Sequence, residues 1–275
     1  MPSLSGRTIA LLESRKKDEL AGMVSRFGGT PVSAPAVTEV PSPEDFGATI
    51  DALAEERFAL AVFLTGAGVN ALIGQADRQG RLPATLAALS RMTVACRGPK
   101  PLAALRRNGL TVHVTTPKPH TSVELLDALA ATDLNDRRVL LVHYGERNPE
   151  VAAALRQRGA RLDEVCPYVW ALPQDTTPLQ RVVRDAVAGR VDAMLFTSQV
   201  QCRHLFQMAD DLGLKADLRR ALADDVVVGA VGPVCAETLR QLGVTPDVIP
   251  AALNMASLIT AVADYFELTD PATPQ

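Results

Sequence analysis

Polar residues, glycines and prolines follow each apolar run that could form a strand in this 275-residue sequence. Four of these turns read "LTGAGV", "CRGPKP", "FTSQV" and "AVGPVC". If the runs are parallel strands, ligands bind at their carboxyl ends, where the first turn of the next helix offers unpaired N–H groups to an anion. Donors so numerous and dispersed suit a large polyanion. The candidate binding residues, with an arginine after the first apolar run, are Arg15, Thr65, Gly66, Arg97, Gly98, Pro99, Lys100, Thr197, Ser198, Gly232, Pro233, Val234 and Cys235.

The residues alone leave a second interpretation of these turns open. Thr65, Thr197 and Ser198 are residue types that cap helix N-termini, a role whose loss costs about 1 kcal/mol. The Gly-Pro pairs at 98–99 and 232–233 are also ordinary turn residues.

The familiar catalytic templates are missing. "GAGVNALIG" lacks the spacing of a dinucleotide-binding GxGxxG turn, and the sequence contains neither a phosphate-binding GxxxxGK[ST] loop nor a GxSxG nucleophile elbow. Its four cysteines, Cys96, Cys166, Cys202 and Cys235, form no CxxC pair, so we expect reduced, small apolar side chains and no zinc site. An enzyme with this sequence would act by holding and folding its substrate.

Composition narrows the class of protein. The chain is 47% hydrophobic and 21% charged, as folded proteins are, and its net charge of −3 with 4% aromatic residues disfavours a general nucleic-acid surface. No apolar run approaches the roughly 20 residues that cross a bilayer, and the basic residues near the N-terminus follow the first apolar run, the reverse of a secretion signal. We therefore expect a cytoplasmic protein that binds neither nucleic acid nor membrane.

The sequence also repeats itself. Four pairs of segments match at an offset of roughly 131 to 134 residues, for example "LAVFLTGAGVNALI" with "DAMLFTSQVQCRHLF". Each segment is a short apolar run, a turn and a helix-period stretch that ends at glycine, and continuous apolar runs are typical of parallel strands covered on both faces. The pattern predicts an α/β fold with two similar doubly wound parallel-sheet domains, produced by internal duplication.

Two proline-bounded segments complicate the division into domains. "PAVTEVPSP" (35–43) and "CPYVWALP" (166–173) occupy equivalent positions in the two repeats, and proline favours extended chain outside central strands. One division cuts the chain near residues 133–136. In the other, both segments cross between sheets, which gives one domain of residues 1–36 plus 174–275, a second of 42–165, and hinge strands at 37–41 and 166–173. The residues by themselves do not decide between the two divisions.

Several segments resemble the uroporphyrinogen-III synthase family, in an order that covers nearly the whole chain: "FTS" after a strand, "GERNPEVAAALRQRGARLDEVCPYVWALP", "GAVGPVCAETLRQLGV" and "SLITAVADYF". The resemblance implies the swapped division, with a two-stranded β hinge. It also implies a hydro-lyase of tetrapyrrole (heme, siroheme or cobalamin) biosynthesis. Such an enzyme cyclises hydroxymethylbilane, a linear tetrapyrrole with eight carboxylates, to uroporphyrinogen III in a cleft between the domains. Ring D is inverted, and neither cofactor nor metal takes part.

The resemblance assigns roles to two aromatic residues. Tyr168 matches the family tyrosine that is proposed to assist departure of the substrate hydroxyl, and a phenol, whose ordinary pKa is about 10, can donate a hydrogen bond while neutral at pH 7. Trp170 is expected to pack the hinge. The turns depart from the family pattern at Gly66, Pro101 and Cys235, where hydroxyl residues are missing.

These departures favour a rival hypothesis, a non-catalytic tetrapyrrole-binding or regulatory paralogue that keeps the cleft without turnover, and "RGPKP" resembles a regulator-fused branch of the family. We expect a monomer that is functionally coupled to hydroxymethylbilane synthase.

Overall fold

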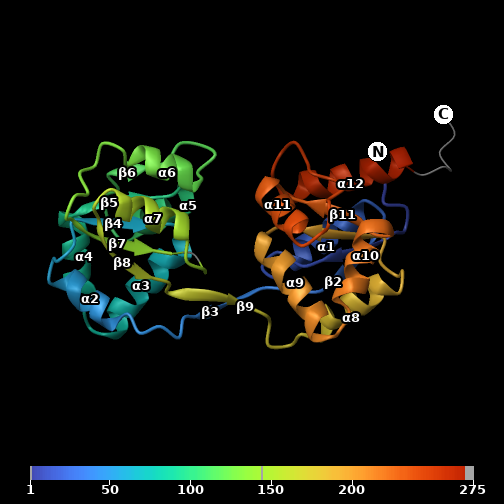
Figure 1. Cartoon of the computed structure of the whole chain (residues 1–275), viewed down its shortest axis with the longest axis horizontal. Helices are drawn as coiled ribbons and strands as arrows, with labels where there is room; N and C mark the ends of the chain where they lie inside the picture. The colour runs from blue at the N-terminus through green and yellow to red at the C-terminus, as the bar shows by residue number, and fades with distance from the viewer. Residues whose placement is uncertain (1, 144, 270–275) are drawn as a thin grey trace. The chain divides into compact units, whose positions relative to one another are not determined.

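A computed structural model of the chain describes residues 2–143 and 145–269. The chain divides into two compact units, Met1–Thr38 with Ala171–Gln275 (unit 1) and Glu39–Trp170 (unit 2). Each unit is an α/β structure built on one parallel sheet, as the alternating apolar runs and helix-period stretches predicted (Figure 1).

The sheet of unit 1 has the strand order β11-β10-β1-β2, and every neighbouring pair is parallel. Its strands are β1 (Thr8–Leu11), β2 (Thr30–Ser33), β10 (Ala193–Phe196) and β11 (Val227–Ala230). All four residues of β10, "AMLF", are buried, because helices cover both faces of the sheet. This is the environment that a continuous apolar run requires.

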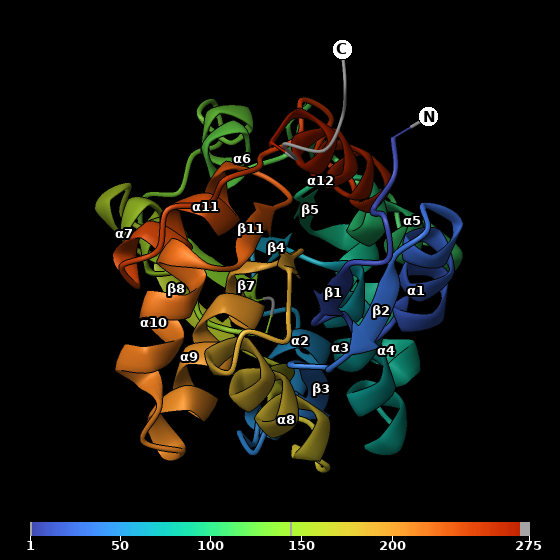
Figure 2. The ribbon, with the colours of Figure 1, turned by 90° about the vertical axis from the view of Figure 1, so that its right-hand side faces the viewer.

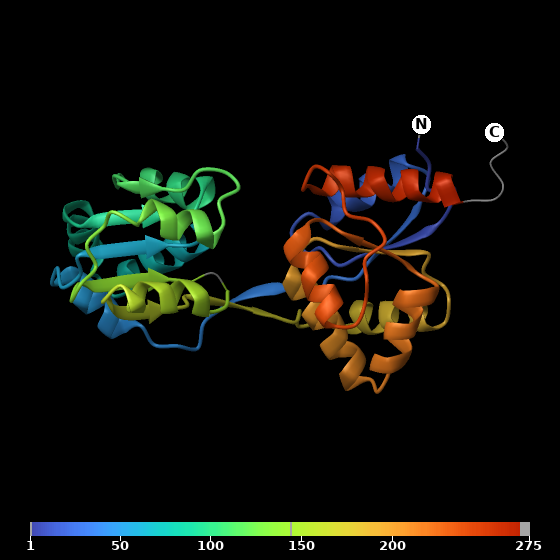
Figure 3. The same ribbon diagram turned by 45° about the horizontal axis from the view of Figure 1, so that its top comes forward.

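Among the described residues of unit 1, six helices form its two outer layers. Leu20, Val24, Leu258 and Val262 join one core cluster, which places their helices, α1 (Lys17–Arg26) and α12 (Met255–Thr269), on one face of the sheet. The opposite face is covered by α8 (Thr177–Val187), α9 (Gln199–Asp211), α10 (Lys215–Asp224) and α11 (Pro233–Gln241). Figure 3 shows the red α12 on one side of this sheet and the orange helices on the other, and Figure 2 shows α10 beside α9.

The sheet of unit 2 has the order β6-β5-β4-β7-β8, again with parallel neighbours. Its strands are β4 (Leu60–Phe63), β5 (Thr93–Cys96), β6 (Val114–Thr115), β7 (Arg138–Val142) and β8 (Arg161–Val165). One face packs against α2 (Gly47–Ala54), α3 (Gly66–Arg78), α4 (Leu82–Arg91) and α5 (Pro99–Arg107). The other face packs against α6 (Ser122–Ala128) and α7 (Pro149–Gln157).

The two sheets share one topology, which makes the duplication visible. The order β5-β4-β7-β8 in unit 2 corresponds to β11-β10-β1-β2 in unit 1, and an isolated bridge between Gly229 and Val248 stands where β6 stands in unit 2. In unit 1, however, β1 and β2 come from the first half of the chain and β10 and β11 from the second. In unit 2, β4 and β5 come from the first half and β7 and β8 from the second. Each unit thus combines a β-α-β segment of one repeat with the remaining strands of the other.

A separate two-stranded antiparallel sheet is formed by β3 (Thr38–Pro41) and β9 (Tyr168–Ala171), which lie side by side in Figure 1. The Ser42 N–H donates to the Pro167 carbonyl at 3.2 Å, next to this pairing. The sheet fits the two-stranded β hinge that the family resemblance implies. Proline keeps the flanking chain extended and unable to join a central strand.

Candidate functional site

Thr65 and Tyr168 lie in direct contact at the carboxyl end of β4. Thr65 is the N-cap of α3, and its Oγ1 accepts a hydrogen bond from the Gly68 N–H at 3.0 Å. The same oxygen lies 3.0 Å from the Oη of Tyr168, whose side chain is 7% exposed. The residue that the family resemblance singled out for chemistry is therefore hydrogen-bonded to one of the predicted binding residues.

Gly66, the next residue, is required by the packing of two helices. A Cβ at this position would lie 2.9 Å from the backbone oxygen of Lys100, so the first turns of α3 and α5 are too close for any side chain here. Close packing of the two helices thus explains why this position carries glycine instead of a residue with a hydroxyl group.

The "RGPKP" turn lies at the end of β5. Gly98 caps α5 with φ +89°, a left-handed conformation that glycine adopts without strain, and Pro99 is the first helical residue. Pro99 and Lys100 are exposed, whereas Pro101, one of the departures from the family pattern, is buried.

Arg97, the first residue of that turn, belongs to a chain of hydrogen bonds that joins five elements of unit 2, namely β5, α6, β7, α7 and β8. Its Nη1 donates to Ser122 Oγ at 3.2 Å, and Asn148 Nδ2 donates to the same oxygen at 3.1 Å. The backbone N–H of Asn148 donates to His143 Nδ1 at 3.0 Å. Because Nδ1 is an acceptor, the hydrogen bonds assign the imidazole proton to Nε2, which donates to Glu164 Oε2 at 2.7 Å.

Burial sets the charge state of this chain. His143 is 0% exposed, and desolvation lowers its pKa although Glu164 opposes that effect, so the imidazole is neutral at pH 7. Burial alone would raise the pKa of Glu164, but hydrogen bonds from His143 and Arg156 outweigh it and lower that pKa. Arg147 also approaches Glu164, at 3.7 Å, and pairs with Glu44 at 2.8 Å.

Sequence reasoning did not select Ser122, His143, Asn148 or Glu164 as site residues. One signal was available, because Asn148 precedes Pro149 and caps α7, with its Oδ1 accepting from the Val151 N–H at 3.0 Å. The convergence of Arg97 and Asn148 on one serine depends on how three strand ends are brought together, and no local pattern records it.

In unit 1, the hydroxyl groups of Thr197 and Ser198 form hydrogen bonds with other residues of the same unit. Thr197 Oγ1 donates to Glu13 Oε2 at 2.8 Å, and Glu13 Oε1 accepts the N–H groups of Ser14 and Arg15, each at 3.1 Å. Ser198 is the N-cap of α9 and forms a capping box with Gln201. The N-cap interpretation is thus correct for Thr65 and Ser198 but wrong for Thr197, which precedes the cap and binds Glu13 instead.

The second Gly-Pro turn, at the end of β11, offers no polar side chain to a ligand. Gly232 caps α11 with an extended backbone, Pro233 follows it, and Val234 is 64% exposed. Cys235 is 3% exposed, and its Sγ lies 3.5 Å from the Sγ of Cys202 in the core. Its thiol faces the core, so the backbone N–H is the group through which Cys235 would contact a ligand.

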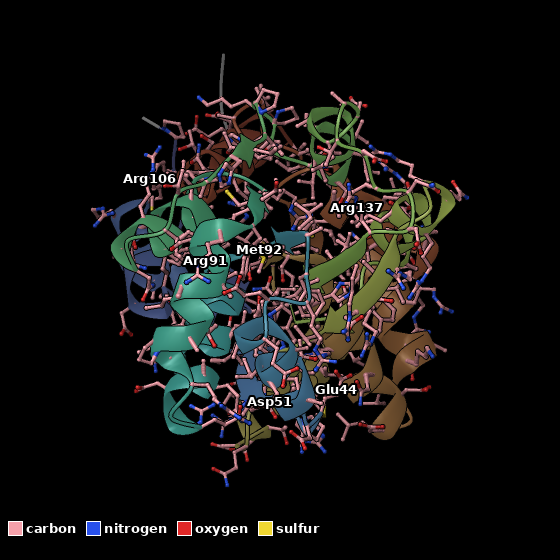
Figure 4. The ribbon with its side chains drawn as sticks, turned by 90° about the vertical axis from the view of Figure 1, so that its left-hand side faces the viewer. Glu44, Asp51, Arg91, Met92, Arg106 and Arg137 are labelled. Carbon is pink, nitrogen blue, oxygen red and sulfur yellow. The ribbon has the colours of Figure 1, made fainter. Side chains whose placement is uncertain are left out.

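Among the residues that the structure describes, each unit has a cavity on its own surface. One, of about 390 Å³, lies between α9 and α11 and is lined by Gln199, Arg203, Pro233, Val234, Glu237, Thr238 and Gln241. The other, of about 240 Å³, is lined by Glu56, Phe58, Ala59, Ala88, Arg91, Met92 and Thr93. Figure 4 shows Arg91 and Met92 beside each other where α4 leads into β5. That cavity lies at the amino ends of the strands, opposite the edge where open α/β sheets bind ligands.

Within residues 2–143 and 145–269, no three His, Cys, Asp or Glu side chains gather in a way that could hold a metal ion. In the same part of the chain, no helix is both long enough and apolar enough to cross a membrane.

One family model matches most of the chain. The family model described as "Uroporphyrinogen-III synthase HemD" matches residues 18–260. The chain is 31% identical over 265 residues to the "Uncharacterized protein YjjA" of Bacillus subtilis, which covers 96% of this chain and 97% of that protein. It is 29% identical over 170 residues to the "Putative uroporphyrinogen-III synthase" of Methanothermobacter thermautotrophicus, covering 62% of this chain and 65% of that protein.

Solved structures give the same result. A crystal structure of a mutant uroporphyrinogen III synthase from Thermus thermophilus matches with a TM-score of 0.73 and 29% identity, over 96% of this chain and 100% of that chain. The synthetase from Helicobacter pylori, at 13% identity and a TM-score of 0.57 over 95% of this chain and 99% of that chain, shares the fold.

Proposed function

The chain belongs to the uroporphyrinogen-III synthase family, and from that premise we propose that it is an active synthase. Hydroxymethylbilane would lose water, close to a macrocycle and invert ring D to give uroporphyrinogen III, a hydro-lyase reaction of tetrapyrrole biosynthesis. The observation that carries the proposal is the 3.0 Å contact between Tyr168 Oη and Thr65 Oγ1 at a strand end, in the chain position that the family resemblance assigns to chemistry.

Tyr168 is the proposed catalytic residue. Thr65 Oγ1 already accepts from the Gly68 N–H, and it can donate its own hydrogen to Tyr168 Oη. In the proposed step, the phenol donates a hydrogen bond to the departing oxygen of the substrate. The C–O bond breaks, the oxygen leaves as water after taking up a proton, and loss of a pyrrole N–H proton leaves a neutral azafulvene. Ring closure through a spiro intermediate and inversion of ring D follow.

We propose that backbone N–H groups and cationic side chains bind the substrate carboxylates. The first turns of α3, α5, α9 and α11 supply N–H groups at strand ends, and Arg15, Arg97 and Lys100 supply positive charge next to such turns. Holding a flexible polycarboxylate in one conformation is the main task, because unguided ring closure gives the uninverted isomer.

A second candidate function is a tetrapyrrole-binding or regulatory paralogue without turnover. It is favoured by the lack of a side chain at Gly66 and by the burial of the Cys235 thiol, because neither position offers a hydroxyl to the substrate.

The deciding experiment supplies hydroxymethylbilane from its synthase and separates the type I and type III products after oxidation. We expect mainly type III product with the protein and type I product without it. If the isomer ratio equals that of the protein-free control while uroporphyrin still binds, the second candidate function is correct.

We further propose that the protein acts in the cytoplasm as a monomer and receives hydroxymethylbilane from its synthase. This substrate closes spontaneously, so rapid transfer between the two enzymes would protect the yield of type III isomer. Sedimentation of the protein alone and mixed with hydroxymethylbilane synthase tests both the monomer and the coupling.

A further inference from the structure

We infer that Ser122 is a positioning and binding residue of this site: together with Arg97 it binds one carboxylate of the substrate, and Asn148 and His143 hold it in place. The inference rests on the proposed function, because it assigns a binding site for one carboxylate of that substrate. Every group involved lies in unit 2, at the carboxyl ends of its strands.

The hydrogen bonds of Ser122 show which positions of its hydroxyl group are occupied. A hydroxyl oxygen has two acceptor positions and one hydrogen to donate. Both acceptor positions are occupied, by Arg97 Nη1 at 3.2 Å and by Asn148 Nδ2 at 3.1 Å. Among the described residues, no hydrogen bond is donated by Ser122 Oγ, and the residue is only partly buried. Its hydrogen is therefore available for donation to a ligand.

The same contacts indicate the chemistry of that ligand. Two donors on one hydroxyl oxygen polarise it and strengthen the hydrogen bond that it donates. One of those donors is a guanidinium, so the pair offers a positive charge and an O–H group from adjacent positions. An anion that only accepts hydrogen bonds fits this pair, and the substrate carboxylates are such groups.

Asn148 is fixed from two sides, which prevents Ser122 from turning inward. The side chain is 7% exposed, and its Oδ1 is committed to the N-cap of α7 through the Val151 N–H at 3.0 Å. The amide oxygen therefore faces the helix and the NH₂ group faces Ser122. A hydroxyl that meets an NH₂ group must accept, and it donates elsewhere.

His143 anchors Asn148 to the sheet. The wholly buried imidazole accepts from the Asn148 N–H at 3.0 Å and donates to Glu164 on the neighbouring strand at 2.7 Å. Glu164 is bound in turn by Arg156. Arg97 and Ser122 are thus held by a chain of contacts that ends at the partly buried Glu164 of β8 and its exposed partner Arg156.

Replacement of Ser122 by alanine is the first test. Because a hydrogen bond to a charged group is worth roughly a factor of ten or more, we expect Ser122→Ala to raise KM for hydroxymethylbilane about tenfold while kcat stays within about twofold. Ser122→Thr keeps the hydroxyl and should restore the wild-type KM. The matched control is Ser90→Ala, because the exposed Ser90 hydroxyl donates only to the Leu86 carbonyl within α4 at 2.8 Å, and it should leave both constants unchanged.

A second variant tests the orientation of Ser122. Asn148→Asp keeps an N-cap acceptor for α7 but removes the donor to Ser122, whose hydrogen then turns toward the new carboxylate. We expect a KM at least as high as that of Ser122→Ala, with the melting temperature close to that of the wild type. A wild-type KM in either variant, or a KM that rises no more than in Ser90→Ala, overturns the inference.

Uroporphyrin binding, followed by quenching of its fluorescence, separates the two proposals. If the wild-type protein forms no type III product, the proposed function is wrong. In that case, weaker uroporphyrin binding by Ser122→Ala than by Ser90→Ala still supports carboxylate binding by Ser122. If the wild type is active, and Ser122→Ala and Asn148→Asp match it in KM and in uroporphyrin affinity, only the inference about Ser122 is wrong.

Discussion

At the scale of single residues, Thr65 performs two tasks with one oxygen. Its Oγ1 caps α3 through the Gly68 N–H and contacts the phenol of Tyr168. The cap fixes the threonine side chain, and the fixed side chain orients the phenol. A residue that looks like an ordinary N-cap is thereby part of the proposed catalytic pair.

Replacing Tyr168 by phenylalanine tests that pair. We expect the rate of type III product formation to fall by at least tenfold, because the donor to the leaving oxygen is lost, a contribution typical of general acid catalysis. The free energy of unfolding should fall by only about 1 kcal/mol, the net value of one hydrogen bond. Single-turnover kinetics and urea unfolding measure the two effects.

Tyr265→Phe, on α12 in unit 1, is the control for Tyr168→Phe and should change neither quantity. An unchanged rate in Tyr168→Phe would assign the tyrosine to the β3–β9 hinge alone.

Gly66 gives a second prediction at this scale. Gly66→Ala should lower the free energy of unfolding by about 1 to 3 kcal/mol, because the new Cβ would meet the Lys100 backbone oxygen at 2.9 Å and force α5 to move. Gly74→Ala in the same helix has open space, with only the end of the Arg78 side chain at 3.6 Å, and should stabilise the protein by about 0.5 to 1 kcal/mol. Chemical denaturation of both variants checks the contrast. Equal effects would mean that the two helices are not packed this closely.

At the scale of elements, the His143–Glu164 contact ties β7 to β8 and to the N-terminus of α7. The strands are paired by backbone bonds along their whole length, for example Leu140 with Asp163. The His143–Glu164 contact adds a side-chain link at the carboxyl end, where the sheet must hold the helix starts in position.

This link predicts a pH dependence of stability. Burial lowers the pKa of His143 in the folded protein, although Glu164 and Glu44 raise it and Arg147 lowers it further. The unfolded chain therefore binds a proton more readily than the folded chain, below the ordinary histidine pKa of about 6.5. Stability is fully present above that value and is lost as the pH falls. The lowered pKa of Glu164 adds a further loss below about 4.5.

Urea midpoints between pH 8 and pH 5 measure the effect of His143. We expect the midpoint to fall with pH in the wild type and to change less in His143→Gln, which cannot take up a proton. A slope in His143→Gln equal to that of the wild type would show that other groups cause the loss.

At the scale of the whole molecule, each sheet is completed by strands from distant parts of the chain. In unit 1, Ile9 of β1 pairs with Ala193 of β10, and in unit 2, Leu60 of β4 pairs with Val139 of β7. Neither sequence repeat contains a complete sheet, so the repeat and the compact unit are different pieces of chain.

This exchange predicts how fragments behave. Residues 39–170, which form unit 2, should fold alone with a cooperative thermal transition. Residues 1–135, one full repeat, should not, because β1 and β2 lack β10, and β4 lacks β7. Circular dichroism during thermal unfolding distinguishes the two fragments. A cooperative transition in residues 1–135 would show that a repeat can close its own sheet.

Much of the fold could be predicted from local sequence. Continuous apolar runs such as "AMLF" indicate strands covered on both faces, and the Gly and Pro turns mark helix starts, because these preferences act over a few residues. The duplication predicted two similar sheets, and the order of the motifs indicated the family. Tyr168 was selected through that resemblance and Thr65 through its position in a turn.

The tertiary structure decided which β-α-β segment joins which sheet, because parallel strands pair through backbone groups that are the same in both repeats. It also decided the surroundings of the site. Gly66 faces a backbone oxygen from another helix, Thr197 binds Glu13 from a distant strand end, and Arg97 and Asn148 meet on Ser122. These contacts join residues far apart in the chain, so they exist only once the sheet has set the distance between its strand ends.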